Sequence, residues 1–273
     1  MSIKIFVDVT NPGHYFAACG LFELTARLDR AAEARFGERT FTIATRVTLA
    51  DVMAKFVAAG FSIARDDSAS DDVDEGEGED EEGGSDSAAP LEVGAPFGLV
   101  LDWWKSEQGK DLKLWAGTMN GPRIAQAMLA ALSSPDVVSP ALLDHAAVVF
   151  DPSSPTKKVE PFYFDARRAG NASSRDVGFA PNDLKFETLA FPAVEALCIV
   201  GLQRFRPVRV ERRVFDYTAW TEPAPLLVGA ALCAGHGQTA IAKTYRFESW
   251  FRTSQKKHKA FKPAILRPEG DAR

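Results

Sequence analysis

Cationic side chains alternate with aromatic rings in three stretches of the C-terminal half of the chain. The first, residues 158–179, reads KVEPFYFDARRAGNASSRDVGF, with an aromatic run followed by two arginines on a turn rich in Gly, Asn and Ser. Guanidinium and ammonium groups neutralise phosphates, and aromatic rings stack on bases by about 1–3 kcal/mol each. Placed together on an adaptable turn, these groups suit a phosphate backbone and an unstacked base.

All three stretches supply candidate nucleic-acid contacts. They are Arg167, Arg168 and Arg175 in the first stretch; Arg204, Arg206 and Arg209 in the second, QRFRPVRVERR, which also holds Arg212 and Arg213; and Arg246, Trp250, Arg252, Lys256, Lys257, His258 and Lys259 in the third, YRFESWFRTSQKKHK. The spacing does not distinguish RNA from DNA.

The third stretch is typical of a strand with two different faces. The period of two places Tyr245, Phe247 and Phe251 on one face. Arg246, Trp250 and Arg252 fall on the other. An alternative stays open for each stretch, in which the rings are core and the cations form the solvated face of the same strand. In the first stretch, Asp165 could also pair with Arg175 or Arg168 and only rigidify the turn.

Histidines are the candidates for general acid–base chemistry. His14 and His236 each follow a glycine in a turn, where a mobile imidazole could transfer protons; the alternative is a surface histidine with no chemical role. His145 lies at the end of an expected helix, and His258 belongs to a lysine-rich patch. The sequence has no P-loop, dinucleotide fingerprint, nucleophile elbow, CxxC or HExxH motif, so no cofactor or metal is expected.

One acidic tract hides a basic protein. The formal net charge is −5, but residues 66–86 hold 12 of the 37 acidic residues and no basic one, so the remaining 25 acidic residues face 32 Lys and Arg, a net of +7. The positive excess indicates an anionic partner. Such a tract repels itself and buries no apolar area, so it predicts a disordered insertion over 66–92, which could shield a basic groove or only aid solubility.

The hydrophobic pattern favours an α+β fold, with a mixed, largely antiparallel sheet and packed helices. Residues 1–65 and 93–273 are expected to form one compact unit around the insertion. Strands are predicted over 3–9, 40–45, 97–104, 112–117, 146–150, 161–165, 208–220, 225–235 and 243–252, with 97–117 as a hairpin. Helices are predicted over 14–36, 49–60, 123–132 and 189–205.

Length and composition indicate a cytoplasmic protein with a core of its own. The chain has 273 residues and no apolar run long enough to span a membrane. The N-terminus starts on a strand pattern, without the segments of a signal peptide. Cys19, Cys198 and Cys233 are far apart in apolar settings, which is typical of buried, reduced thiols.

Five separated segments resemble one known family. They are VDVTNPGHYFAACGLFELTARL (7–28), WAGTMNGPRIAQAM (115–128), PFYFDARRAGNASSRDVGFAPN (161–182), LAFPAVEALCIVGLQRFRP (189–207) and YRFESWFRTSQKKHKAF (245–261). Together they resemble the accessory protein, associated with the large subunit, of Cascade-type CRISPR loci of subtype I-U, also called I-G. The N-terminal run is also similar to the large subunits themselves. The acidic tract departs from the family pattern.

The resemblance implies a non-catalytic subunit of a crRNA-guided surveillance complex in antiviral defence. Its implied partners are the other effector-complex subunits, crRNA and target DNA, with no membrane, and its implied fold is related to the ferredoxin-like RAMP proteins. It places the family pattern on Phe164, Asp165, Arg167, Arg168, Arg175, Asp176, Gln203, Arg204, Phe205, Arg206, Arg246, Arg252, Gln255, Lys256, His258 and Lys259. Two alternatives remain: a metal-independent endoribonuclease that processes crRNA with His14 or His236, and a protein–protein adaptor.

Overall fold

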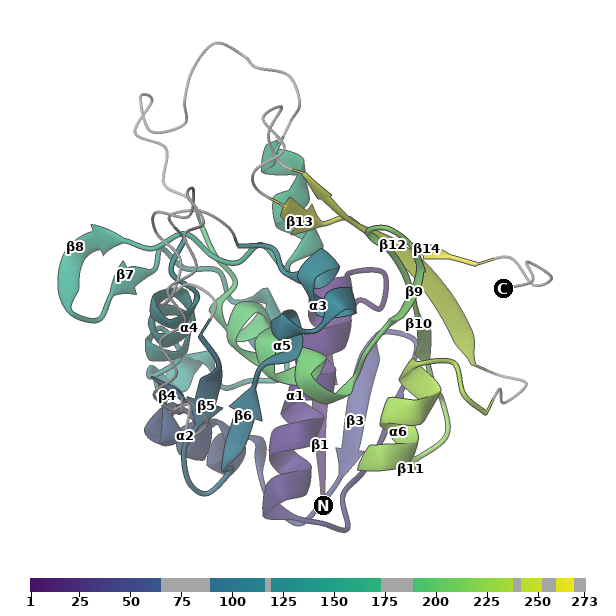
Figure 1. Cartoon of the computed structure of the whole chain (residues 1–273). Coiled ribbons are helices and arrows are strands. Elements are labelled where there is room, and N and C mark those ends of the chain that lie inside the picture. The colour runs from purple at the N-terminus through teal and green to yellow at the C-terminus, as the bar shows by residue number, and fades with distance from the viewer. Residues whose placement is uncertain (65–88, 116–118, 173–188, 238–241, 252–258, 268–273) are drawn as a thin grey trace, which may run out of the picture.

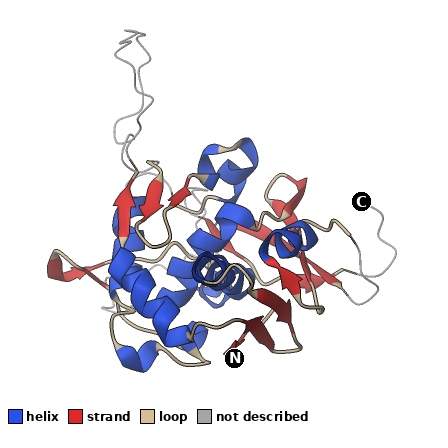
Figure 2. Cartoon of the chain, turned by 90° about the horizontal axis from the view of Figure 1, so that it is seen from below, coloured by secondary structure: helices blue, strands red, loops and turns tan. Residues whose placement is uncertain are grey.

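The fold is α+β with antiparallel sheets, as the sequence predicts. The computed structural model describes residues 1–64, 89–115, 119–172, 189–237, 242–251 and 259–267. Within them the helices are α1 (Pro12–Leu28), α2 (Leu49–Ala59), α3 (Glu107–Leu112), α4 (Gly121–Ala130), α5 (Pro192–Arg204) and α6 (Leu226–Cys233). Figure 2 shows these helices in the middle of the molecule with strands on either side.

Within the described residues, four antiparallel sheets lie around the helices. The first has the order β1 (Ser2–Phe6), β3 (Thr40–Ala44), β2 (Glu33–Phe36) and β11 (Ala224–Pro225). The second has the order β13 (Lys259–Phe261), β12 (Lys243–Phe251), β10 (Val214–Ala219) and β9 (Val208–Glu211), with β14 (Ile265–Leu266) also pairing with β12. The two small sheets are β4 (Phe61–Ile63), β5 (Leu91–Val93) and β6 (Leu99–Leu101), and the hairpin β7 (Phe150–Asp151) and β8 (Ser154–Lys158).

The N-terminal third follows part of the ferredoxin-like pattern. Its element order β1-α1-β2-β3-α2, with β1 paired to β3, is the start of a β-α-β-β-α-β unit. The next strand departs from that pattern, because β4 pairs with β5 instead of joining the first sheet. The predicted C-terminal boundary of the insertion, residue 92, was therefore wrong, because β5 already begins at Leu91. Residues 65–88 lie outside the described residues.

Helix α1 is the centre of the core (Figure 1). It begins at a sequence signal for a helix start: the Asn11 side chain accepts a hydrogen bond from the Gly13 backbone N–H, and Pro12 follows it. Its residues are buried from Pro12 to Ala26, because the first sheet covers one side and α5 crosses the other. Ile3, Ile5 and Phe41 of the sheet point toward it and are almost fully buried.

Aromatic rings fill the core on both sides of α1. One cluster comprises Tyr15, Phe36, Phe41, Tyr217 and Trp220, and another comprises Trp103, Trp104, Trp115, Phe162 and Phe164. Phe162 and Phe164 have no exposed surface. Tyr163 between them is only 6% exposed, so these three rings of the first candidate stretch are core residues and do not offer a surface on which a base could stack. Phe179, the last ring of that stretch, lies outside the described residues.

Several predicted elements were wrong. The helix expected over 14–36 ends at Leu28, and its last residues form β2. The hairpin expected over 97–117 is β6, a 3-10 turn and α3, which Ser106 caps by accepting a hydrogen bond from the Gly109 backbone N–H. The strand expected over 225–235 is α6, because a short apolar run fits a buried helix and a strand equally well.

Two further strand predictions differ from the structure. Residues 161–164 have no strand pairing, and Tyr163 has a positive φ of 73°. The strand expected over 208–220 is the hairpin β9–β10, which turns at Arg212 and Arg213, where Arg213 has φ of 66°. This turn carries both arginines to the end of the second sheet. The other predicted helices, α2, α4 and α5, lie close to where the sequence places them.

Candidate nucleic-acid interface and buried polar network

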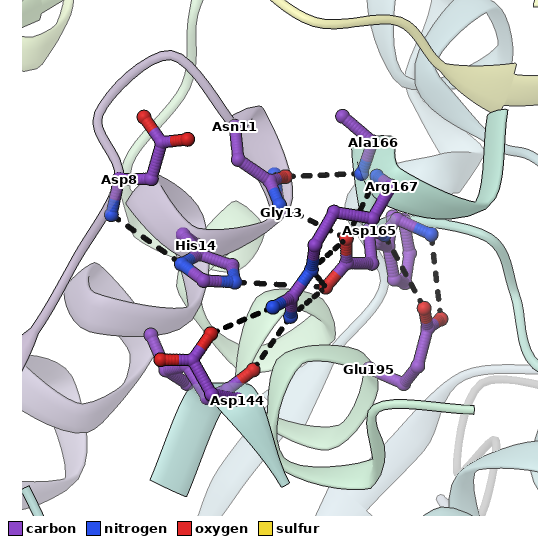
Figure 3. A network of polar contacts seen from close by, with 11 residues as sticks. Asp8, Asn11, Gly13, His14, Asp144, Asp165, Ala166, Arg167 and Glu195 are labelled. Atoms are coloured by element: carbon purple, nitrogen blue, oxygen red, sulfur yellow. Dashed lines mark hydrogen bonds and ion pairs between the residues drawn. The ribbon is translucent and has the colours of Figure 1, made fainter. Parts of the chain in front are cut away.

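Arg167 is held by carboxylates of its own chain (Figure 3). Its Nη2 lies 2.7 Å from Oδ2 of Asp165, and its Nη1 lies 2.6 Å from Oδ1 of Asp144. The guanidinium carbon also lies 3.6 Å from the centroid of the Phe191 ring. Arg168, on the same turn, is half-buried, and Arg175 lies outside the described residues. Arg167 thus rigidifies the turn, although the sequence pointed to Arg168 or Arg175 as the partner of Asp165.

Asp165 is the centre of a buried network that joins three of the family-like segments. Its side chain has no exposed surface. It accepts a hydrogen bond of 2.9 Å from Nδ2 of Asn11, the residue that precedes α1. Asn11 Oδ1 in turn accepts from the backbone N–H of Ala166 at 3.0 Å. Burial alone would raise the pKa of Asp165, but His14 and Arg167 outweigh it and hold the pKa below its usual range. Asp165 is therefore ionised and fixed in place.

His14 has both ring nitrogens directed at protein groups. Its Nδ1 accepts from the Asp8 backbone N–H at 3.4 Å, and its Nε2 lies 3.6 Å from Asp165 Oδ2. The residue is only 3% exposed, beside a pocket of about 520 Å³ that Asp8 and Arg39 also line. A general base needs a free nitrogen within reach of its substrate, so this geometry favours a structural role.

His236 has the opposite surroundings. It is exposed on a glycine turn, and among the described residues its ring has no hydrogen-bond or ion-pair partner. No carboxylate orients it there, as the base of a catalytic pair requires. His14, by contrast, lies within α1 and not on the turn that the sequence predicts.

Glu195, on α5, is the unexpected member of the network. Its carboxyl group is fully buried and accepts from the backbone N–H groups of Phe164 and Asp165 at 3.4 Å and 3.3 Å. Burial, followed by the charge of Asp165, raises the pKa of Glu195 from 4.5 to about 8. The sequence could not reveal this acid, because a single Glu in an apolar helix looks like an exposed residue.

The raised pKa of Glu195 is expected to make the free energy of unfolding depend on pH. Its pKa is higher in the folded than in the unfolded chain, so its contribution to stability is fully present below about pH 4.5. That contribution falls by about 1.4 kcal/mol for each pH unit as the pH rises toward 8. Glu195→Gln, which stays neutral, should match the wild type near pH 5 and be clearly more stable at pH 9. Urea unfolding across this range measures the difference.

The control for this titration is Glu33→Gln, on the exposed side of β2. This variant should follow the wild-type curve at every pH. Parallel curves for the wild type and Glu195→Gln would show that Glu195 does not take up a proton on folding.

Three arginines of the second stretch also have partners within the chain. Arg204 pairs with Glu23, a fully buried acid of α1 that also binds Arg27. Arg206 donates to the carbonyls of Gln203 and Trp103 at 3.1 Å and 3.3 Å. Arg209 Nη2 lies 3.1 Å from Asp111 Oδ2. These cations link α5 and β9 to neighbouring elements.

The third stretch is divided between internal pairs and exposed groups. Arg246 makes two hydrogen bonds to the carboxylate of Asp216, which faces it across the β10–β12 register. Lys259 Nζ donates to the carbonyls of Lys110 and Asp111, and burial lowers its pKa to about 8. Arg252, Lys256, Lys257 and His258 lie outside the described residues.

Trp250 is a described candidate contact with a large exposed ring. It is 45% exposed on the outward face of β12, as the strand period predicts, while Tyr245 and Phe247 point inward. Lys262 Nζ lies 4.6 Å and the Arg213 guanidinium carbon 5.2 Å from the centroid of a Trp250 ring. We call Trp250, Arg213 and Lys262 the Trp250 cluster. Sequence patterns could not indicate Lys262, since only the β12–β13 pairing brings it near.

The described residues also set limits on other kinds of site. No His, Cys, Asp or Glu cluster within them could hold a metal ion. No helix among them is long and apolar enough to cross a bilayer. The three cysteines are buried and unpaired, as predicted.

The chain has no match among known protein families, curated proteins or solved structures.

Proposed function

We propose that the protein is a non-catalytic subunit of a subtype I-U/I-G CRISPR surveillance complex, which acts in the cytoplasm in antiviral defence. In this role it contacts crRNA, target DNA or neighbouring subunits. The observation that carries the proposal is that the five family-like segments, which are separated in sequence, pack against one another in the folded chain.

Contacts between these segments support the proposal. Asn11 binds Asp165, and the carboxyl group of Glu195 binds the backbone at Phe164 and Asp165. Phe261 packs against Phe164 and Trp115 packs against Phe162, with ring centroids 5.4 Å and 4.8 Å apart. The likeness therefore lies in buried residues that define a fold. Such a pattern favours a framework subunit over an enzyme with a reactive pocket.

The Trp250 cluster is the surface we assign to the partner. An unpaired base can stack on the exposed indole when a cation that lies over its ring, Arg213 or Lys262, moves aside to a phosphate. Lys262 would then also leave Glu248, whose Oε2 lies 2.9 Å from its Nζ. The cluster stands at the end of the second sheet, immediately before residues 252–258, which carry the remaining cations of the third stretch.

Co-purification tests the proposal. Tagged protein from cells that hold the repeat–spacer array and the interference proteins should bring down the other subunits and crRNA. Trp250→Ala combined with Arg213→Ala should reduce that recovery about tenfold or more, since one lost stack is worth about 1–3 kcal/mol. Recovery is measured by mass spectrometry and by probing for crRNA, with Phe150→Ala, a ring 40% exposed elsewhere, as the control.

Two outcomes would contradict the proposal. Wild-type protein that recovers no complex subunit would exclude the subunit role. Cleavage of labelled repeat RNA that is lost in His14→Ala or His236→Ala would favour the endoribonuclease instead.

A further inference from the structure

A second cationic surface is lined by residues other than the contacts predicted from the sequence. It is a groove of about 650 Å³ between the outward face of the first sheet and the start of β12. Its polar walls are formed by Lys4, Arg35, Thr40, Thr42, Thr221 and Lys243. These residues come from β1, β2, β3, the segment after β10 and β12, so only the folded chain brings them together.

The strand register fixes a row of donors on one wall. Lys4 stands opposite Thr42, and Thr42 stands opposite Arg35 on its other side. Residues directly opposite one another in antiparallel strands project from the same face. Neighbouring strands lie about 4.8 Å apart, so the two cations flank the hydroxyl with backbones roughly 10 Å apart. The inward neighbours Ile3 and Ile5 are core residues, which keeps this row directed outward.

The cations of this groove differ from four arginines of the three stretches, which pair with internal carboxylates: Arg167, Arg204, Arg209 and Arg246. Within the described part of the chain, Lys4, Arg35 and Lys243 make no ion pair and no side-chain hydrogen bond. All three are exposed. Glu38 is the acidic residue among those that line the groove, so three positive charges face one negative charge. Cations without internal carboxylates remain available for an external anion.

The polar atoms of the walls match phosphodiester groups. Lys and Arg neutralise phosphates, and threonine hydroxyls donate to phosphate oxygens without reading bases. Among the described residues that line the groove there is no large exposed ring, because Tyr245 is only 7% exposed and Phe36 only 2%. The surface therefore suits the backbone of a strand and carries little sequence preference.

We infer that the groove formed by Lys4, Arg35, Thr42 and Lys243 binds the phosphate backbone of single-stranded nucleic acid. The inference rests on the proposed function and deepens it, since it adds a backbone track to the stacking site at Trp250. The groove positions a strand through its phosphates, whereas the Trp250 cluster holds a base.

Fluorescence anisotropy of the purified full-length protein tests this inference with a labelled mixed-sequence 20-nucleotide single strand, as RNA and as DNA. Lys4→Ala, Arg35→Ala and Lys243→Ala are combined in one variant. Affinity should fall at least tenfold for either strand. The slope of log affinity against log salt should become shallower by about 2, because each phosphate contact on a single strand contributes about 0.7.

The matched control removes the same charges elsewhere. Arg30→Ala, Lys105→Ala and Lys157→Ala take away one exposed arginine and two exposed lysines outside the groove. This variant should keep most of the affinity and nearly the wild-type slope, and circular dichroism should show both variants folded. Equal losses in the two variants, or an unchanged slope in the groove variant, would overturn the inference.

A competing class of partner gives a different result. If labelled oligoglutamate binds the wild type at least as tightly as the strand does and loses affinity in the groove variant, the partner is an acidic protein surface and the inference is overturned. The assay needs no other subunit, so it is independent of co-purification. Strand binding with failed co-purification would refute the proposed subunit role alone, and the reverse result would refute the groove alone.

Discussion

Replacing Gly201 by alanine is expected to lower the free energy of unfolding by about 3 kcal/mol or more, the upper end of the cost of overpacking a core. A Cβ atom on Gly201 would lie 2.0 Å from the carbonyl oxygen of Phe16, and one on Gly20 would lie 2.0 Å from that of Leu197. Both clashes are with backbone, so no side-chain rotation relieves them. Alanine favours a helix by only about 1 kcal/mol over glycine, and the clash outweighs this gain.

The size of the effect follows from the position of the two glycines. They let α1 and α5 cross with their backbones in contact at the centre of the core, so separating the helices would open space around Tyr15, Phe16 and their neighbours. A natural domain is stable by only about 5–15 kcal/mol. Urea unfolding followed by circular dichroism measures the loss, and Gly20→Ala should behave like Gly201→Ala.

Gly37→Ala is the matched control. The nearest atom to its Cβ would be the rotatable hydroxyl of Thr40, at 2.8 Å, and the Thr40 carbonyl lies farther away at 3.6 Å. This variant should stay within about 0.5 kcal/mol of the wild type. Wild-type stability of Gly201→Ala would mean that the helices do not cross as closely as described.

Local signals mark the ends of several helices. Asn11 and Pro12 mark the start of α1, and Gly60, with φ of 69°, marks the end of α2. Each signal acts through its immediate chain neighbours, so it can be read without knowing the fold. The apolar run that forms α6 has no such signal, and its conversion from predicted strand to helix depends on tertiary packing.

In the candidate site, too, local patterns could be predicted from the sequence and contacts between distant segments could not. The period of two correctly placed Trp250 and Arg246 on the outward face of β12. It could not show that Asp216 faces Arg246, because that pairing depends on the register of another strand. The Lys4–Thr42–Arg35 row could not be predicted for the same reason, because it depends on the register of three strands. Sequence patterns therefore found where cations lie, but not which of them are already paired.

Arg167→Ala is expected to cost about 3 kcal/mol of stability at neutral pH. Removing one partner of a buried ion pair leaves the other charge uncompensated, which costs about 3–5 kcal/mol. The lower end applies because the Arg167 side chain is 36% exposed, although Asp165 is fully buried. Urea unfolding at pH 7 measures the loss. Arg212→Ala, an exposed arginine on a turn, should change stability by no more than about 0.5 kcal/mol.

The pH dependence identifies the cause of that loss. The pKa of Asp165 is lowered in the folded protein, so its contribution is present above the ordinary carboxyl pKa of about 3.9 and is lost as pH falls below it. Without Arg167 this contribution shrinks, so the gap between wild type and Arg167→Ala should be largest at pH 7 and narrow by about pH 3. A gap that stays constant would instead assign the effect to packing of the guanidinium on Phe191.

The same variant separates the two roles that Arg167 has been given. If Arg167 only holds the turn, Arg167→Ala that remains folded should bind single-stranded nucleic acid with the wild-type salt dependence, because its guanidinium already lies between Asp165 and Asp144. A shallower salt slope in the folded variant would show that Arg167 exchanges these carboxylates for phosphates. The network would then be a surface that opens on binding, and Asp165 would be the charge that a bound strand displaces.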